Sequence, residues 1–595
     1  MIRTPLRPLA RILDAREKGE SLEAIERENI RLRGEAVRDK VRSRAQGRLL
    51  ILGAIFLGSF ITVGARMGTL AASAPQEPQI ATAGQTIVAG RADITDRKGR
   101  ILATNLLTHS LYAQPRLMVD PERVALELGE IFPDLDVARL TKDLTGSRKF
   151  LWIKKKLSPE QMQAVHDIGD PGLLFGPREM RLYPNGPIAS HILGGARFGN
   201  EGVSSAEVLG VAGVEKAFDG WLRDPANGGA PLQLSIDLTV QSILEEVLDG
   251  GMKLMNAKGA TAVMIEVKTG EIVAMASLPD FDPNDRPTPL LKGDPSDSPL
   301  FNRAVQGLYE LGSCFKIFAV AQAMQLGLVN PQTMIASKSP MQYGRFKIRD
   351  FHNYGDQLSV TDIIVKSSNI GTARIAQLIG PERQKEFLGQ LGFLAPTSVE
   401  LIEAPTGRPI LPQKWSEISS MTISYGHGLS ASPLHLAAAY ATLANGGRKI
   451  SPTLVHSEDP EVIASRFGPQ VVEPHIAEES LKMMRAVVTR GTASFGEVKG
   501  YEVAAKTGSA DKVKPTGGYY KDKVIGTFAG MFPASDPEYV LVLTLDEAVE
   551  TSGPIPRRTA GWTAVPVAAE VIRRTAPVLG LRPIESLEGI TLVNN

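Results

Sequence analysis

The sequence has one cysteine, few histidines and almost no net charge among its 595 residues, and each shortage excludes a class of protein. A single cysteine, Cys314, rules out an internal disulfide and any zinc site built on cysteines. The eight histidines are scattered, without a pair at H-x-x-x-H spacing, so we expect no metal site and no cofactor. A net charge of +1 argues against nucleic acid as a partner.

A long uncharged apolar run near the start of the chain predicts a membrane span. Residues 1–48 carry 13 lysines and arginines against 8 acidic residues, and residues 49–65 then contain no charge. The run is long enough for one span, and the basic flank places residues 1–48 in the cytoplasm and the rest outside. A cleaved signal peptide is the alternative, because residues 72–74 resemble a cleavage site. The long leading segment instead favours an uncleaved anchor over 49–70.

Composition divides the rest of the chain into a linker and two folded parts. Residues 71–88 are rich in Ala, Gln, Pro, Gly and Thr without periodicity, which predicts a linker. Residues 89–230 contain short mixed elements, including a hairpin expected between Ile94 and Ile101. In residues 231–595 strands come first, helices in the middle and strands last. This order predicts one α+β domain whose terminal strands share a sheet.

The first motif with chemical meaning is the pair Ser313 and Lys316. Their spacing places both side chains on one face of a helix that begins here. A serine hydroxyl becomes nucleophilic when a neighbouring base takes its proton, and a lysine serves as base only if burial or a nearby cation lowers its pKa. The apolar residues that follow Lys316 predict such burial. Cys314, the rival nucleophile, would lie on the opposite side of the helix, without a base.

Two further motifs follow in a specific order. Ser367-Ser-Asn369 lies within the apolar-periodic stretch 360–378, and Lys506-Thr-Gly-Ser509 comes near the end. S-x-x-K, then S-x-N, then K-T-G is the motif order of serine acyl-transferases. A single triplet means little, since Lys268-Thr-Gly270 is also K-T-G. That triplet lies ahead of Ser313 between two strand-like runs and predicts a hairpin turn.

With these motifs in this order, the sequence resembles the class B penicillin-binding proteins, of the FtsI-type septal peptidoglycan D,D-transpeptidase branch (the penicillin-binding protein 3 group). The resemblance covers nearly everything after residue 85. Its matching segments are 91–99, 181–184, 189–194, 213–215, 235–237, 309–316, 366–369, 424–447 and 506–510. Three positions differ from the commonest pattern: Leu311 replaces a usual Pro, and Cys314 and Ser509 replace usual Thr. Cys314 is therefore expected to place an oxidisable thiol beside the nucleophile.

The resemblance implies an α+β fold with a penicillin-binding-protein/β-lactamase-like transpeptidase domain, an antiparallel sheet with helices, over 231–595. An α/β pedestal of the dimerisation type over 89–230 and one transmembrane helix would precede it. It implies that Ser313 attacks the carbonyl between the two D-alanines of a peptidoglycan stem peptide, with Lys316 taking the serine proton. β-Lactams would mimic the D-Ala-D-Ala end and acylate Ser313.

The other motif residues receive roles by the same resemblance. Ser367 and Asn369 would relay protons and hold the substrate amide. Lys506 and Thr507 would face the terminal carboxylate of the peptide, with Gly508 and Ser509 completing the substrate-binding strand. The backbone N–H groups of Ser313 and Ser509 would form an oxyanion hole. An amine from a second stem peptide would then displace the serine and make a cross-link.

The resemblance also implies partners and a location. No segment marks a transglycosylase, so glycan polymerisation is expected from an FtsW-type membrane glycosyltransferase, beside other division proteins. A helix expected around residues 21–40 is either a partner site or part of a solvated tail. The protein is expected in the cytoplasmic (inner) membrane as a single-pass protein, with its catalytic domain in the periplasm at the septum.

Several other classes share parts of this pattern. A β-lactamase seldom carries an anchor and a pedestal and needs a deacylating carboxylate, which the sequence does not identify. A membrane-anchored penicillin-sensing receptor should lack the pedestal segments, and a non-catalytic scaffold should have lost Ser313 or Lys316. An elongation-specific class B transpeptidase shares all of the chemistry and differs in its partner, so this alternative stays open.

Overall fold

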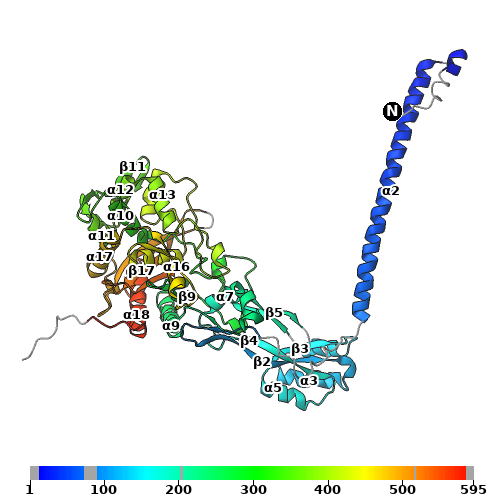
Figure 1. Cartoon of the computed structure of the whole chain (residues 1–595), viewed down its shortest axis with the longest axis horizontal. Helices are drawn as coiled ribbons and strands as arrows, with labels where there is room; N and C mark the ends of the chain where they lie inside the picture. Colours follow the sequence, from blue (N-terminus) through cyan, green and yellow to red (C-terminus); the bar gives the residue numbers. More distant parts are fainter. Residues whose placement is uncertain (1–12, 20, 73–89, 202–205, 515–516, 585–595) are drawn as a thin grey trace, which may run out of the picture. The chain divides into compact units, whose positions relative to one another are not determined.

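The computed structural model describes residues 13–19, 21–72, 90–201, 206–514 and 517–584, which fall into two compact units. Figure 1 shows the elements with their labels. The first unit ends at Gly84 and the second begins at Gln85. The linker expected over 71–88 lies outside the described residues, apart from two positions that end the first long helix.

The first unit consists mainly of one continuous helix, α2 (Leu22–Ala72), of 51 residues. The helix expected around residues 21–40 and the apolar run beginning at residue 49 are therefore parts of the same element. By length and composition the segment Ile30–Met67 is able to cross a membrane, and none of its most apolar window is buried. An exposed apolar helix of this length is consistent with a membrane anchor.

The pedestal part of the second unit is built on the long strand β2 (Ile101–Ala113). This strand pairs antiparallel with β1 (Ile94–Thr95), β3 (Leu151–Leu157) and β4 (Leu173–Leu182). The β1–β2 connection confirms the predicted hairpin. Three helices begin at Asp or Ser caps and bury leucine and valine side chains in the pedestal core: α3 (Pro121–Ile131), α4 (Val137–Leu144) and α5 (Pro159–Asp167). The remaining pedestal elements are α6 (Ser190–Leu193), β5 (Gly195–Glu201), β6 (Ala206–Ala212), α7 (Gly213–Ala217) and α8 (Asp219–Leu222). Just beyond the pedestal, β7 (Leu232–Gln233) pairs in parallel with β1.

A buried ionic cluster ties the pedestal segments together. The carboxylate of Glu215 is fully buried and accepts hydrogen bonds from Arg91 at 2.6 Å and from Arg181 at 2.7 Å. The hydroxyl of Tyr183 donates to the same carboxylate at 3.2 Å. Removing Glu215 would leave buried arginine charges without this partner and without water, which is strongly destabilising. Three of the pedestal segments named in the sequence therefore converge on one side chain.

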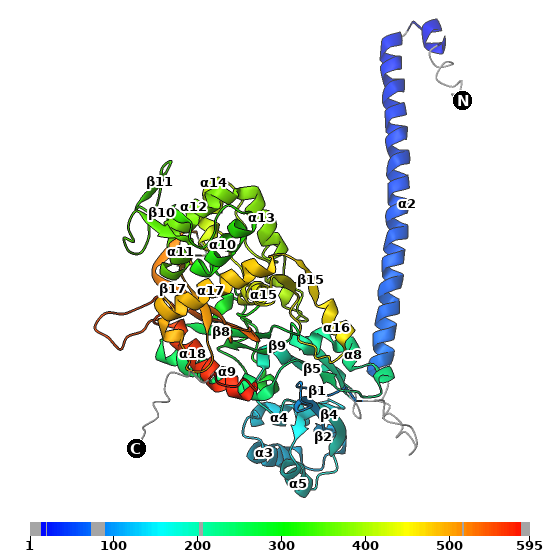
Figure 2. The same ribbon diagram turned by 60° about the vertical axis from the view of Figure 1, so that its left-hand side comes forward.

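The catalytic part contains a five-stranded antiparallel sheet in the order β16-β17-β18-β8-β9. Its strands are β8 (Gly259–Glu266), β9 (Ile272–Leu278), β16 (Ala504–Val513), β17 (Tyr519–Phe532) and β18 (Tyr539–Asp546). The first two strands form the predicted hairpin around Lys268–Gly270, and the last three confirm that the terminal strands share a sheet. Figure 2 shows α9 (Leu238–Leu254) and α18 (Ala564–Val578) together on one face and α15 (Pro433–Ala444) on the other.

A helical region stands beside the free edge of β16. It contains α10 (Lys316–Gln325), α11 (Val360–Lys366), α12 (Asn369–Ile379), α13 (Pro381–Gln390), α14 (Glu417–Ser424) and α17 (Pro474–Arg490). The stretch 360–378, expected as one apolar-periodic element, breaks at Ser367 and Ser368. Ser367 ends α11 with a left-handed backbone (φ 62°), and Ser368 caps α12 by accepting from Gly371 N.

Short elements complete this part. Three two-stranded ladders join β10 (Met334–Ala336) to β13 (Gln357–Ser359), β11 (Met341–Tyr343) to β12 (Phe346–Ile348), and β14 (Arg448–Ile450) to β15 (Phe467–Gln470). A short helix, α16 (Pro460–Ser465), precedes β15. The loop after β12, residues 349–356, leads to the S-x-N motif, which Asp350 contacts.

Candidate active site

Ser313 lies in a tight turn that the predicted helix follows rather than includes. Residues 312–315 form a 3-10 turn, and α10 begins at Lys316. Side chains three apart also share a face in a 3-10 turn, so the prediction that Ser313 and Lys316 lie together keeps its geometric basis. Gly312 has φ +57°, and a Cβ there would lie 3.0 Å from Ser509 N. Glycine therefore allows residues 312–315, called the nucleophile turn after the predicted role of Ser313, to lie against β16.

Two buried lysines meet at one hydroxyl beside this turn. Lys316 Nζ and Lys506 Nζ each donate to Ser367 Oγ at 3.1 Å. Lys316 also donates to the carbonyl of Ser367, and Lys506 to the carbonyl of Thr507 at 3.0 Å. Both lysines are fully buried. The arrangement joins the lysines of two motifs through the serine of the third.

Burial and mutual repulsion determine the charge state of this pair. Burial, together with the neighbouring Lys506 cation, holds the pKa of Lys316 well below its ordinary value of 10.5. Burial lowers the pKa of Lys506 to about 8. Since a hydroxyl has one proton to donate, Ser367 is able to pass its proton to a neutral lysine while accepting from a charged one. The predicted condition for Lys316 to act as a base is thus met.

Lys506 occupies a different place from the one expected. The sequence predicted that its ammonium faces the cleft and meets a carboxylate, but the ammonium is buried behind Ser367. The K-T-G strand presents Thr507 and Ser509 to the cleft instead. In a strand, successive side chains point to opposite faces, so Thr507 faces the cleft because Lys506 turns inward.

Cys314 does not place a reactive thiol in the site, so that expectation was wrong. Its side chain is fully buried, with Sγ 3.5 Å from the carbonyl oxygen of Lys506. Burial raises the pKa of the thiol to about 12, which keeps it protonated. The prediction that it lacks a base, and is no rival to Ser313, agrees with this position.

Asp350 is a site residue that the sequence did not reveal. Its carboxylate accepts from Ser368 Oγ at 2.7 Å, from Asn369 N at 2.5 Å and from Ile370 N at 3.0 Å. These bonds cap α12 and hold the S-x-N motif in place. Asp350 stands 17 residues before Ser367 in an irregular loop, so no periodicity or spacing marks it.

The opposite wall of the cleft is held by bonds that also had no sequence signal. Thr492 Oγ1 lies 2.7 Å from Thr507 Oγ1, and Ser509 Oγ accepts from the backbone N–H of Ala560 at 2.8 Å. A Cβ on Gly508 would lie 2.1 Å from the carbonyl oxygen of Leu311, so this glycine permits β16 to pass close to the nucleophile turn. These contacts orient the two hydroxyls that line the cleft.

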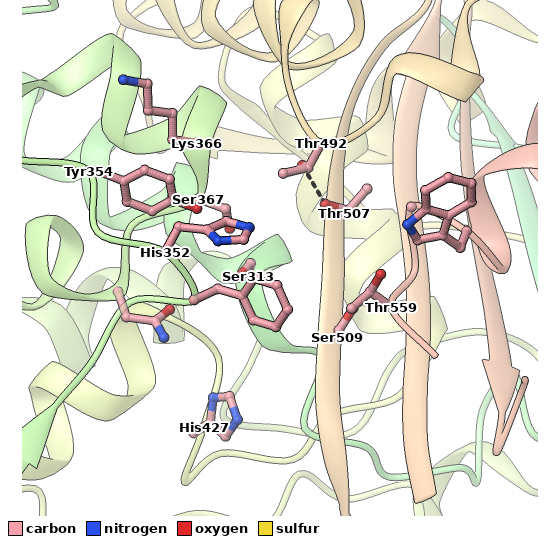
Figure 3. A pocket seen from close by; sticks show the side chains of 14 residues that line it. Ser313, His352, Tyr354, Lys366, Ser367, His427, Thr492, Thr507, Ser509 and Thr559 are labelled. Atoms are coloured by element: carbon pink, nitrogen blue, oxygen red, sulfur yellow. Dashed lines mark hydrogen bonds between the residues drawn. The ribbon is translucent and has the colours of Figure 1, made fainter. Parts of the chain in front are cut away.

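The cleft has a volume of about 360 Å³ and is open to solvent. Figure 3 shows Ser313 between Ser367 on one side and Thr507 with Ser509 on the other. Asn369 also lines it, with Nδ2 donating to Arg349 O at 3.1 Å. The other lining residues are Phe351, His352, Tyr354, Lys366, His427, Thr492, Thr559, Gly561 and Trp562. A half-buried serine near a lysine of lowered pKa, in a cleft of this size, suits covalent acyl transfer.

Comparison with known proteins gives a consistent answer. Residues 260–572 match the penicillin binding protein transpeptidase domain, and residues 86–229 match the penicillin-binding protein dimerisation domain. The chain is 34% identical over 552 residues to the probable peptidoglycan D,D-transpeptidase FtsI of Caulobacter vibrioides, covering 91% of this chain and 89% of the relative. It is 28% identical over 496 residues to the peptidoglycan D,D-transpeptidase FtsI of Escherichia coli K12, covering 78% and 80%.

A solved structure shares the fold. Penicillin binding protein 3 of Mycobacterium tuberculosis, complexed with aztreonam, aligns with a TM-score of 0.63 at 23% identity. The alignment covers 84% of this chain and 98% of that chain. At this identity the likeness concerns the arrangement of the pedestal and the catalytic part, and the chemistry of the site rests on the geometry above.

The two lysines should differ in how their loss affects acylation. Lys316→Ala should abolish labelling by a fluorescent penicillin even at saturation, because the base is gone. Lys506→Ala removes a neighbouring cation, so the pKa of Lys316 should rise. The acid limb of the acylation rate against pH should then move upward by about one pH unit. Rates at saturating penicillin across pH measure both effects. Acylation by Lys316→Ala at a normal rate would show that another group is the base.

Replacing Asp350 should disturb the site although Asp350 itself does not line the cleft. Asp350→Ala leaves two backbone donors and the Ser368 hydroxyl without their charged acceptor, bonds worth about 1.5–3 kcal/mol each. We expect acylation to slow by about 10–100-fold, measured with fluorescent penicillin. Asp459→Ala is the matched control, since Asp459 caps α16 away from the cleft. Similar acylation by both variants would contradict a positioning role for Asp350.

Proposed function

Because the chain belongs to the penicillin-binding protein transpeptidase family, as a class B peptidoglycan D,D-transpeptidase of FtsI type and a target of β-lactams, we propose that Ser313 is its acylated residue. The observation that carries this proposal is the convergence of Lys316 and Lys506 on Ser367 beside the nucleophile turn. This convergence supplies a base of lowered pKa next to a half-buried serine.

In the first half of the reaction Ser313 Oγ attacks the carbonyl carbon between the two D-alanines of a stem peptide. Its proton passes to neutral Lys316, and the C–Oγ bond forms as the carbonyl becomes an oxyanion. When the oxyanion collapses, the C–N bond to the last D-alanine breaks. The leaving nitrogen takes the proton back from Lys316 through Ser367. The products are an ester on Ser313 and free D-alanine.

Groups around Ser313 complete the binding of the peptide. The backbone N–H groups of Ser313 and Ser509 stabilise the oxyanion, an effect of about 3–4 kcal/mol per donor in other enzymes. The close approach of Gly312 to the Ser509 backbone supports this pairing. The hydroxyls of Thr507 and Ser509 bind the terminal carboxylate, and the buried charge of Lys506 favours an anion there. Asn369 holds the substrate amide.

In the second half an amine from another stem peptide displaces Ser313 and makes the cross-link. β-Lactams enter the first half in place of the D-Ala-D-Ala end and leave Ser313 acylated. The assignment of both halves to one cleft is supported by its opening to solvent and by its aromatic rim, which includes the exposed ring of Phe351.

The proposal extends to the organisation of the protein in the cell. Residues 1–48 lie in the cytoplasm, 49–70 cross the cytoplasmic membrane, and 71–88 link the anchor to a periplasmic body. A pedestal over 89–230 then carries a transpeptidase domain over 231–595. An FtsW-type membrane glycosyltransferase at the division septum supplies the glycan strands. The basic flank, the apolar helix α2 and the FtsI relatives support this arrangement.

Peptide mapping tests the nucleophile. After labelling with fluorescent penicillin, the tagged peptide should contain Ser313, and Ser313→Ala should lose the label entirely. Cys314→Ser serves as the matched control and should still be labelled, because its side chain is buried away from the cleft. A tag on Cys314, or undiminished labelling of Ser313→Ala, would refute the assignment.

Fusions to green fluorescent protein test orientation and place together. Green fluorescent protein does not form its chromophore when it is exported unfolded. A fusion ahead of residue 1 should therefore fluoresce, and a fusion after residue 595 should stay dark. The fluorescent fusion should gather at midcell in growing cells. A bright C-terminal fusion would reverse the topology, and a dispersed lateral pattern would favour the elongation role.

A further inference from the structure

His427 lines the cleft with Ser313, yet the reaction described above does not use it. Figure 3 shows its imidazole on the other side of Ser313 from Ser367. It belongs to the loop between α14 and α15 and is half-buried. The residues on both sides, Gly426 (φ +86°) and Gly428 (φ +82°), are in the left-handed region, so the histidine stands on a tight turn.

This turn is fastened to the segment that carries the nucleophile. Gly312 N donates to Gly426 O at 3.2 Å, and a Cβ on Gly426 would lie 1.8 Å from Gly312 O. On the other side of the histidine, Gly428 N donates to the Glu310 carboxylate at 2.7 Å. His427 is therefore held between two contacts, each to a residue within three positions of Ser313.

One nitrogen of the imidazole lacks a hydrogen-bond partner. Its Nδ1 is buried and, within the part of the chain that the structure describes, has none. Its ring packs against the rings of Tyr425 at 5.5 Å and Tyr519 at 6.4 Å between centroids. A buried polar nitrogen without a partner is costly unless a ligand or water completes it.

Charged groups on several elements face this imidazole. The Glu310 carboxylate, a hydrogen bond with the backbone of Tyr425 and the Asp511 carboxylate favour its cation, whereas Lys316 disfavours it. The hydroxyl of Tyr519 donates to Glu310 at 3.0 Å. Burial is the largest influence and lowers the pKa of His427 below its usual 6.5, so the imidazole is neutral at pH 7. Its lone pair is then available to take a proton.

The second half of the reaction needs a base for the incoming amine. The acceptor amine arrives as an ammonium ion, which has no lone pair with which to attack the ester. Lys316 and Lys506 both meet Ser367, on the opposite side of Ser313. The carboxylates of Glu310 and Asp511 near His427 would attract an ammonium ion to its side.

We propose that His427, held beside the nucleophile turn by Gly426 and Gly428, is the catalytic base that deprotonates the acceptor amine of a stem peptide. The proposal rests on the proposed function of the cleft. One proton of the ammonium passes to the imidazole. The freed nitrogen pair forms a C–N bond with the ester carbon, and the C–Oγ bond to Ser313 breaks. The second proton from nitrogen passes through Lys316 to Ser313 Oγ, and His427 later releases its proton to water.

The test separates the two halves of the reaction in the full chain. Acylation is measured with fluorescent penicillin, and transfer is measured with a D-alanyl thioester substrate and D-alanine as acceptor. His427→Asn should slow transfer to D-alanine by about 100-fold or more, the usual effect of losing a general base, while acylation stays within about threefold. Transfer to hydroxylamine, which is unprotonated at neutral pH, should fall much less.

The pH dependence adds a readout that a structural role would not move. Transfer by the unchanged protein should rise with pH below neutrality as His427 loses its proton, whereas transfer by His427→Asn should follow the deprotonation of D-alanine itself. His475→Asn, at an exposed histidine outside the cleft, is the matched control and should keep the unchanged protein's ratio of transfer to acylation. Equal losses with both acceptors, or equal losses of acylation and transfer, would overturn the proposal. Absence of acylation in the unchanged protein would instead refute the proposed function.

Discussion

The site depends on keeping two lysine side chains out of water around one hydroxyl. Two ammonium ions that share one hydrogen-bond partner repel each other strongly in a medium of low dielectric constant. The arrangement therefore holds only if at least one lysine gives up its proton readily. That requirement lowers the pKa of Lys316, as its proposed role as a base needs. Lys316 comes from α10, Lys506 from β16 and Ser367 from the end of α11, so the fold must bring all three elements together before any chemistry is available.

Other contacts in the domain hold the elements that carry Lys316, Lys506 and Ser367 in place. The sheet fixes β16 through β17 and β18, whose middle residues are buried, and the free edge of β16 is left for the nucleophile turn. Asp350 secures the start of α12, and Thr492 secures Thr507. In the pedestal a second buried cluster, around Glu215, fixes segments over a hundred residues apart. In both clusters buried charged groups lose their solvation, and the contacts between them define the local geometry.

A transpeptidase must move protons in two directions, first away from its serine and then away from an incoming amine. One side of this cleft holds the lysines and Ser367, and the other holds a neutral imidazole beside two carboxylates. Separating the bases in space would let an acyl group occupy the middle of the cleft without blocking either one. The glycines around His427 make that placement depend on the backbone, because Gly426 O accepts from Gly312 N and Gly428 N donates to the Glu310 carboxylate.

The sequence by itself determined the apolar helix, the hairpin at Lys268–Gly270, the terminal strands and the order of the three motifs, because these depend on local spacing and composition. It could not locate Asp350, Thr492 or the free lone pair of His427, and it misplaced the ammonium of Lys506 and the thiol of Cys314. Those features follow from contacts between residues far apart in the chain. Burial, and therefore pKa and reactivity, is decided by what packs against a side chain, and only the tertiary structure supplies those neighbours.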